Sequence, residues 1–251
     1  MRMILIFIAT ILSACNSSMP PSQIGQQIKT QDYILQIFWP ATVENQKGQT
    51  LRIFIEGDGR AFVRGYPSQD PSPKSPLVRQ LMEQSTGSRV YLARPCQYLK
   101  NHHCSVDDWT KGRFSPRVIK AMDEAIDIIK QQVSASDIDL IGYSGGAAIA
   151  LLLAAQRNDV NHVYTIAGNL DPDWVMDSLS LPRLINSENP VNYKNRLRQI
   201  KQTHWLGLDD NIISPAIGAY WQRLMGTNSN IIYVQATHSQ GWLKLWQHGP
   251  W

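Results

Sequence analysis

The stretch Ile138-Asp-Leu-Ile-Gly-Tyr-Ser-Gly-Gly-Ala147 decides the fold of this chain. Its first four residues, 138–141, form a short apolar run of the length and β-branched content expected of a buried parallel strand. Residues 147–155 are apolar on every side, which predicts a fully buried helix. A strand, a sharp turn and a buried helix are therefore expected in direct succession.

The turn between them matches the pattern G-x-S-x-G, with Ser144 at its centre. Between a strand and a helix, this pattern is typical of a nucleophile elbow, which exposes a serine hydroxyl above the sheet. Gly142 and Gly146 have no Cβ, so the strand and helix can approach closely. The Gly145 amide, at the positive end of the helix, is expected to face an oxyanion. The alternative is a glycine-rich turn with an idle serine.

The composition suits one large globular domain. The chain has 251 residues, of which 43% are hydrophobic and 18% charged, enough for a substantial core. The formal net charge is +4, but Lys and Arg are scattered, without a run or a basic-aromatic stripe. We therefore expect no nucleic-acid partner.

Residues 1–14 predict an export signal, because one positive charge precedes an apolar run of about a dozen residues, too short for a membrane span. The end of this segment, Leu12-Ser-Ala-Cys15, resembles the lipobox of bacterial lipoproteins. That resemblance implies a lipid anchor on Cys15, and Asn16 leans toward outer-membrane sorting. The expected location is thus the bacterial cell envelope, at the periplasmic face of the outer membrane. An uncleaved anchor or plain secretion is the alternative.

The rest of the chain alternates strands with helices. Residues 15–30 are polar and predict a flexible tether, followed by one domain at 31–251. With right-handed crossovers, the alternation gives a mostly parallel sheet with helices on both faces. Strands are predicted at 33–39, 51–55, 89–93, 138–141, 160–167, 203–207 and 231–235, and helices at 76–86, 115–133, 147–155, 196–200, 215–225 and 242–248.

Two cysteines remain in the predicted domain, Cys96 and Cys104. An even pair in an exported protein predicts a disulfide bond. The neighbouring His102 and His103 leave a metal site open as an alternative, although the spacing fits no standard zinc pattern.

The segment 56–59, Glu-Gly-Asp-Gly, directly follows the predicted strand 51–55. Its glycines place backbone amides at the carboxyl edge of the sheet. In an acyl-transfer site the second oxyanion donor belongs here, and the Asp58 amide is the predicted donor. An ordinary turn is the alternative.

With these elements the chain resembles the α/β-hydrolase fold superfamily over nearly the whole predicted domain. The resemblance implies a triad in the chain order serine, acid, histidine. Ser144 takes the serine position, and His238, just after the last predicted strand, takes the histidine position. The segment after strand 203–207 looks like the family's Gly-x-x-Asp pattern, which selects Asp210 as the acid, with Asp209 as the alternative.

This chain departs from the family pattern in two places. The strand 51–55 leads into Glu56-Gly57, where many members have His-Gly. The long segment 94–113 is not a general family feature, and we expect a structural role for it. The aperiodic stretch 168–192 lies where related folds insert a small cap. Substrate specificity is expected to reside in this cap and the surrounding loops.

The other histidines have a simpler interpretation. His162 and His204 lie in or beside predicted strands and are expected to be structural. His102 or His103 replaces His238 as the base only if their loop reaches over Ser144.

A serine hydroxyl needs a base to act as a nucleophile at neutral pH. His238 is expected to take its proton, and Asp210 to hold one imidazole tautomer. No cofactor or metal is required. The leading prediction is a serine hydrolase that cleaves a carboxylic ester or thioester of a small or lipid-like acyl group through an acyl-enzyme. The alternatives are an amide or peptide hydrolase and a non-catalytic envelope lipoprotein that retains the fold.

Overall fold

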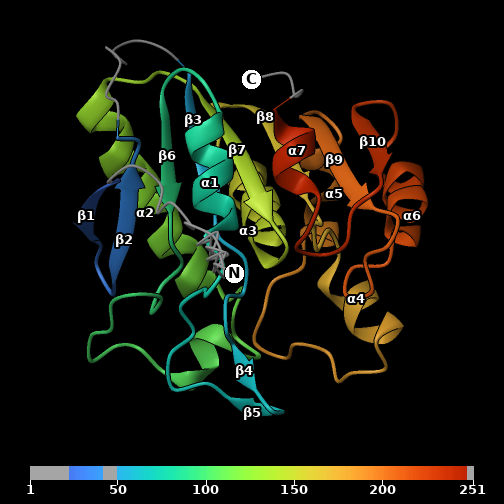
Figure 1. The fold of residues 1–251 in the computed structure, drawn as a ribbon, viewed down its shortest axis with the longest axis horizontal. Helices are drawn as coiled ribbons and strands as arrows, with labels where there is room; N and C mark the ends of the chain where they lie inside the picture. The colour runs from blue at the N-terminus through green and yellow to red at the C-terminus, as the bar shows by residue number, and fades with distance from the viewer. Residues whose placement is uncertain (1–22, 42–49, 248–251) are drawn as a thin grey trace, which may run out of the picture.

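An eight-stranded sheet forms the centre of the molecule in the computed structural model, which describes residues 23–41 and 50–247 (Figure 1). The spatial order of its strands is β1-β2-β6-β3-β7-β8-β9-β10. The strands are β1 (Ile24–Lys29), β2 (Ile34–Trp39), β3 (Leu51–Ile55), β6 (Arg89–Leu92), β7 (Ile138–Tyr143), β8 (Val160–Ile166), β9 (Lys201–Gly207) and β10 (Ser229–Val234), and a separate two-stranded hairpin consists of β4 (Phe62–Val63) and β5 (Tyr66–Pro67).

Most neighbouring strands in the large sheet run parallel. Every pairing from β6 through β3, β7, β8 and β9 to β10 is parallel, whereas β2 is antiparallel to both β6 and β1. Parallel strands need crossover connections, and helices supply them here. The predicted mostly parallel sheet is therefore confirmed.

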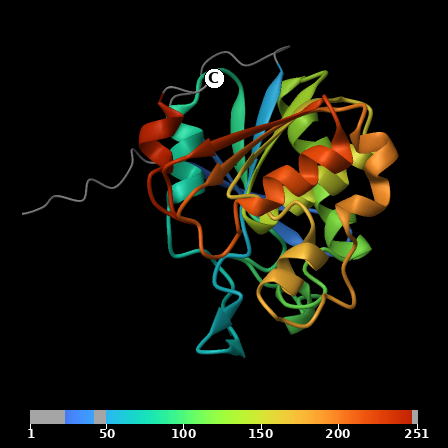
Figure 2. The same cartoon turned by 90° about the vertical axis from the view of Figure 1, so that its right-hand side faces the viewer.

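Helices cover both faces of the sheet (Figure 2). One face carries α1 and α7, whose apolar residues pack with Phe54, Tyr91 and Ile141. The other face carries α2, α3 and α6 over the larger part of the core. The helices are α1 (Leu77–Gln84), α2 (Pro116–Val133), α3 (Gly145–Gln156), α4 (Pro172–Ser178), α5 (Lys194–Leu197), α6 (Ala216–Met225) and α7 (Trp242–Trp246), with 3₁₀ turns η1 (Val106–Trp109) and η2 (Pro190–Tyr193).

The helix α3 lies at the middle of this second layer. Its residues 145–154 are all buried, because β7 and β8 cover one side and α2, α5 and η2 the others. This enclosure explains why its sequence shows no polar face. The predicted order of strand, turn and helix is confirmed, but the turn is shorter than predicted: β7 extends to Tyr143 and α3 begins at Gly145, so one residue separates them.

The first strand corrects the predicted tether. Residues 24–29, assigned to the tether at 15–30, form β1 and pair with β2 along their full length. Only Ile28 of β1 is buried, so the segment offers too little apolar periodicity to signal an edge strand. The predicted signal segment 1–14 and Cys15 lie outside the described residues. None of the described helices is long and apolar enough to cross a bilayer.

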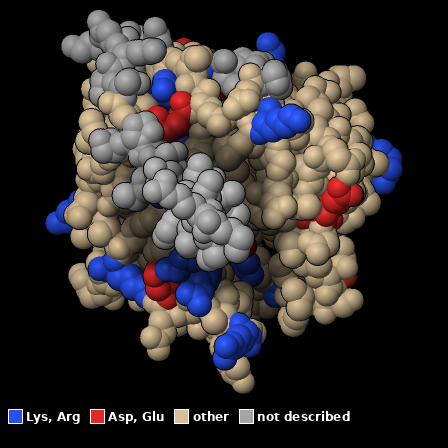
Figure 3. Space-filling view, in the orientation of Figure 1, with Lys and Arg blue, Asp and Glu red and all other residues tan. Residues whose placement is uncertain are grey.

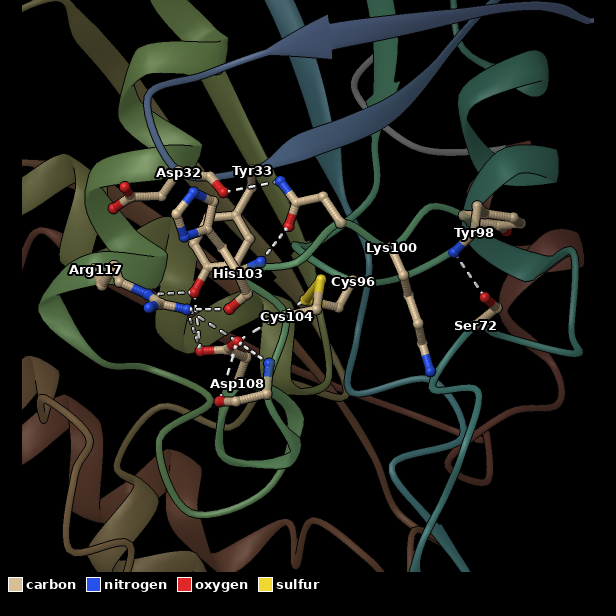
Figure 4. The surroundings of a disulfide bond; sticks show 12 residues. Asp32, Tyr33, Ser72, Cys96, Tyr98, Lys100, His103, Cys104, Asp108 and Arg117 are labelled. Carbon is tan, nitrogen blue, oxygen red and sulfur yellow. Dashed lines mark hydrogen bonds and ion pairs between the residues drawn. A yellow bond between two sulfur atoms is a disulfide. The ribbon is translucent and has the colours of Figure 1, made fainter.

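The predicted disulfide between Cys96 and Cys104 is present (Figure 4). Beside it, the buried carboxylate of Asp108 accepts hydrogen bonds from the Tyr33 hydroxyl at 2.8 Å and the Ser105 amide at 2.8 Å. The disulfide closes a loop within the long segment 94–113, and the Asp108 carboxylate attaches this segment to Tyr33, the residue before β2. The expected structural role of the segment is thereby given a physical basis.

We expect Ile28→Ala to lower the free energy of unfolding by about 2–4 kcal/mol, because it removes a buried side chain from the edge of the core. The neighbouring Gln27→Ala, at an exposed position of the same strand, should change it by less than about 0.5 kcal/mol. Urea unfolding at neutral pH measures both. Equal effects of the two substitutions would show that β1 does not dock on the sheet.

Candidate active site

Ser144 occupies the single position between β7 and α3, with φ of 51° and ψ of −120°. A non-glycine residue in this region carries backbone strain of about 1–3 kcal/mol, which surrounding contacts must hold in place. The glycines around it permit the close approach that the sequence predicted. A Cβ on Gly142 would lie 2.5 Å from the Gly146 carbonyl oxygen, and one on Gly146 would lie 2.5 Å from the Ile55 carbonyl oxygen.

Three side chains predicted from the sequence meet at the carboxyl edge of the sheet. The His238 Nε2 atom lies 3.0 Å from the Ser144 hydroxyl, and His238 Nδ1 lies 2.8 Å from a carboxylate oxygen of Asp210. These residues follow β10, β7 and β9, which end at the same edge. The geometry permits a proton to pass from the hydroxyl to the imidazole while the carboxylate faces the other ring nitrogen.

Asp210 rather than Asp209 contacts the histidine. The second carboxylate oxygen of Asp210 accepts the amide N–H groups of Ile212 at 2.8 Å and Ile213 at 2.9 Å, which fixes the orientation of the buried side chain. Asp209 is exposed and accepts a hydrogen bond from the Gln235 amide.

The histidine is also held through its backbone. Its carbonyl oxygen accepts the Tyr143 hydroxyl at 3.0 Å and the Trp242 indole N–H at 3.0 Å. Both donors lie at the ends of elements, since Tyr143 is the last residue of β7 and Trp242 is the first residue of α7. Sequence reasoning missed both contacts, because nothing local to Tyr143 indicates a partner 95 positions away, and the Trp242 contact depends on the path of the turn between β10 and α7.

Asp58, whose amide was the predicted oxyanion donor, lies beside Gly145. Among the described residues, neither the Asp58 amide nor the Gly145 amide donates a hydrogen bond to a protein group. The Asp58 carboxylate instead binds two guanidinium groups, those of Arg94 and Arg113, with Arg113 at 2.6 Å. Partial burial alone would raise the Asp58 pKa, but Arg113 and Arg94 outweigh it and lower that pKa to about 2.

Sequence reasoning did not identify the two arginines. A signal for Arg94 existed, because it follows β6, the strand that pairs with β3, and so stands next to the segment after β3. Arg113 is nineteen positions further along, beyond the disulfide, and its approach depends on the path of that loop. The Arg94 side chain also reaches the Arg113 carbonyl oxygen at 2.7 Å, which joins the two.

Glu56 supports the same segment from beneath. Its carboxyl oxygens accept the Gly57 amide and the Tyr91 hydroxyl, each at 2.9 Å, and the Gln97 side chain donates to the Gly57 carbonyl at 3.0 Å. Burial raises the Glu56 pKa to about 7, against the lowering effect of the Gly57 amide and Tyr91. Hydrogen bonds therefore fix both the amide and the carbonyl group of Gly57, in the backbone segment that faces Ser144.

Among residues 23–41 and 50–247, no histidine other than His238 hydrogen-bonds Ser144. Burial lowers the pKa of His204 to about 3 and that of His162 to about 4, and both rings hydrogen-bond threonines of neighbouring strands. These values keep both rings neutral near pH 7, as expected of structural residues. The rings of His102 and His103 lie 3.9 Å apart and tilted by 42° in the disulfide loop, where Figure 4 places His103 beside Arg117.

Two cavities open at Ser144. The larger, of about 670 Å³, lies under α4 and the following loop, and the smaller, of about 450 Å³, lies beside residues 73–77. The larger is lined mainly by apolar side chains, namely Phe62, Val175, Met176, Leu179, Leu181, Leu184, Ile185, Ile212 and Ile213. The segment 168–192, predicted to be a cap, therefore supplies much of one wall.

Several solved structures resemble this chain. An esterase of Pyrococcus furiosus shares 14% identity over 90% of this chain and 87% of its own, with a TM-score of 0.61. Est1E of Butyrivibrio proteoclasticus, solved with ferulic acid, shares 13% over 89% and 95%, with a TM-score of 0.64. Acylaminoacyl peptidase of Pyrococcus horikoshii shares 11% over 88% of this chain and 38% of its own, with a TM-score of 0.60.

No protein-family model matches the chain, and no curated protein matches it. At this level of identity, the structural likenesses show the fold. Together with the strand order and the helices on both faces, they establish the α/β-hydrolase fold that the sequence predicted.

We expect Asp58→Asn to lower the free energy of unfolding by about 1–3 kcal/mol at pH 7, because two buried guanidinium groups lose their counterion. The Asp58 pKa falls from 3.8 to about 2 on folding. Its stabilising effect is therefore complete above pH 3.8 and is lost as the pH falls through about 2. The difference in the free energy of unfolding between wild type and Asp58→Asn should therefore be smaller near pH 3 than at pH 7.

Urea unfolding at pH 7 and near pH 3 measures that gap. Asp209→Asn, at an exposed aspartate after a neighbouring strand, is the matched control and should cost less than about 0.5 kcal/mol at pH 7. A gap for Asp58→Asn that is the same at both pH values would contradict the assigned ion pair.

Proposed function

We propose that this protein is a serine hydrolase that cleaves a carboxylic ester or thioester through an acyl-enzyme on Ser144. The observation that carries the proposal is the continuous hydrogen-bonded chain from the Ser144 hydroxyl through His238 to Asp210, with distances of 3.0 and 2.8 Å. The esterases among proteins of the same fold support it. An idle serine would need neither of the other two side chains at these distances.

In the proposed reaction, His238 Nε2 accepts the proton of Ser144 as the hydroxyl oxygen attacks the carbonyl carbon. The same nitrogen then donates this proton to the leaving oxygen or sulfur as its bond to the carbonyl carbon breaks, and an alcohol or thiol departs. Water then attacks the acyl-enzyme by the reverse route and releases a carboxylic acid. Asp210 keeps the proton of the neutral imidazole on Nδ1 and then stabilises the imidazolium that forms, while its other oxygen is held by two amides.

The amides of Asp58 and Gly145 are the proposed oxyanion donors. Support comes from their free N–H groups within the described structure and from the position of Gly145 at the first turn of α3. Each such donor contributes about 3 kcal/mol to transition-state stabilisation. The contacts of Glu56 and Gln97 keep the first of these amides in place by fixing the adjacent Gly57.

An amide or peptide hydrolase is the second candidate. The acylaminoacyl peptidase of the same fold favours it, since one triad geometry serves both bond types. Parallel assays on esters of rising acyl length and on peptide amides distinguish the two candidates. Cleavage of amides without esters would replace the leading proposal with this one.

We expect a fluorophosphonate probe to label the protein and Ser144→Ala to abolish the labelling. Asp210→Asn should lower kcat/KM for an ester by about 10²–10⁴-fold, because it disturbs the tautomer and charge of His238. Asp209→Asn, the adjacent control, should change it by less than about 3-fold, since Asp209 contacts Gln235 instead.

A folded wild-type protein that takes up no probe and cleaves neither esters nor amides would favour the non-catalytic lipoprotein. Circular dichroism and urea unfolding of each variant separate a loss of chemistry from a loss of fold. Equal losses in Asp209→Asn and Asp210→Asn would reject the assignment of the acid.

We further propose that the protein is tethered to the bacterial envelope by a lipid on Cys15. The lipobox-like end of the predicted signal segment and the disulfide, which suits an oxidising compartment, support this. We expect Cys15→Ser or globomycin to change the precursor size and the membrane-bound fraction in bacterial cells, whereas Ser17→Ala changes neither. An unchanged size and membrane fraction in Cys15→Ser would remove the anchor.

A further inference from the structure

The two cavities at Ser144 differ in their relation to the histidine. Both are lined by Asp58, Phe62, Ser144 and Ile212, so both open onto the nucleophile. His238 lines the smaller cavity and not the larger. The site is therefore divided into one compartment on the histidine side and one on the opposite side.

This division indicates which half of a substrate lies in each cavity. The assignment rests on the serine hydrolase function proposed above. In acyl transfer the histidine delivers its proton to the departing oxygen or sulfur, so the leaving group must lie on the histidine side. The smaller cavity then holds the leaving group. The larger cavity holds the acyl chain.

The larger cavity suits an apolar acyl chain. Its wall under α4 includes Val175 and Met176, with Leu184 from the following loop. Three cations line it, and each has a carboxylate partner: Arg183 with Asp177 at 2.5 Å, Arg113 with Asp58 at 2.6 Å and Lys111 with Asp107 at 3.9 Å. This compartment therefore offers apolar surface and cations that already have carboxylate partners.

The smaller cavity is lined by two cations that are not tightly paired. Arg60 and Lys74 line it, and the Arg60 guanidinium makes no hydrogen bond or ion pair with any described residue. Lys74 lies 3.7 Å from Asp70, but both side chains are more than half exposed, so the pair is weak. Figure 3 shows Lys and Arg side chains gathered over the lower part of this face, where the β4–β5 hairpin projects.

The acidic groups of the smaller cavity are already engaged. Glu56 uses its two carboxyl oxygens for a backbone N–H and the Tyr91 hydroxyl. The Asp58 carboxylate is bound by both Arg94 and Arg113, so its negative charge is already compensated. A ligand in this cavity therefore meets cations whose charge is not cancelled.

We propose that the substrate is an ester or thioester of an apolar carboxylic acid whose leaving alcohol or thiol carries an anionic group, such as a carboxylate or a phosphate. Ser144 forms a bond to the carbonyl carbon as the bond to the leaving oxygen or sulfur breaks. That atom receives the proton held by His238 and departs with its anionic group unchanged. Water completes hydrolysis of the acyl-enzyme, and Arg60 and Lys74 bind the anion without taking part in the chemistry.

The test uses four octanoyl esters that differ only in the charge of the leaving phenol. Their leaving groups are 4-hydroxyphenylacetate, 4-hydroxybenzylphosphonate, the neutral 4-hydroxyphenylacetamide and a 4-hydroxyphenethyl trimethylammonium. A methylene spacer keeps the phenol acidities close. We expect kcat/KM for the anionic esters to exceed that of the neutral ester by about 5–10-fold at low salt, through KM, and to approach it at 1 M NaCl. The two anions separate carboxylate from phosphate-like recognition.

Substitutions of the two cations test whether these side chains cause the preference for an anionic leaving group. Arg60→Gln with Lys74→Gln should bring the anionic-to-neutral ratio close to 1, and Arg60→Glu with Lys74→Glu should favour the cationic ester. Arg64→Gln, at the tip of the β4–β5 hairpin and outside both cavities, is the matched control and should retain the wild-type ratio.

Three outcomes overturn the inference. Hydrolysis of the neutral ester without an anionic preference, or a preference that survives the double substitution, overturns it while leaving the proposed hydrolase standing. Failure to cleave any of the four esters overturns both proposals.

Discussion

The close approach of three backbone segments around Ser144 is the constraint on which the site depends. β7, α3 and the end of β3 meet at Gly142 and Gly146, where the neighbouring backbone atoms leave no room for a Cβ. Because the chain must reverse from a buried strand into a buried helix within one residue, Ser144 adopts a positive φ and presents its side chain at the sheet edge. The complete burial of α3 supplies the packing that holds this strain.

Much of this arrangement could be predicted from the sequence. The strand, turn and helix of the elbow follow from local residue types. The choice of Asp210 and His238 came from the resemblance to the α/β-hydrolase fold, whose triad runs in the order serine, acid, histidine. Parallel strands bring their carboxyl ends to one edge, so residues far apart in the chain can meet there without any local signal of contact.

Other features could not be predicted, for identifiable physical reasons. β1 carries one buried side chain, and edge strands with such weak alternation resemble polar linkers. The pairing of Asp58 with Arg94 and Arg113 depends on the path of a long loop fixed by the Cys96–Cys104 disulfide. Loop paths are determined by tertiary contacts, and periodicity carries no information about them.

The disulfide loop therefore connects stability to the electrostatics of the site. One carboxylate and two guanidinium groups stand next to Gly145, and the Arg94 side chain is nearly inaccessible to solvent. At such low exposure a net positive cluster favours negative charge nearby more strongly than a surface pair would. Asp58 is needed to bury the two arginines, yet their combined charge exceeds its own. The same ion pairs that hold the loop thus place a net positive cluster near Ser144.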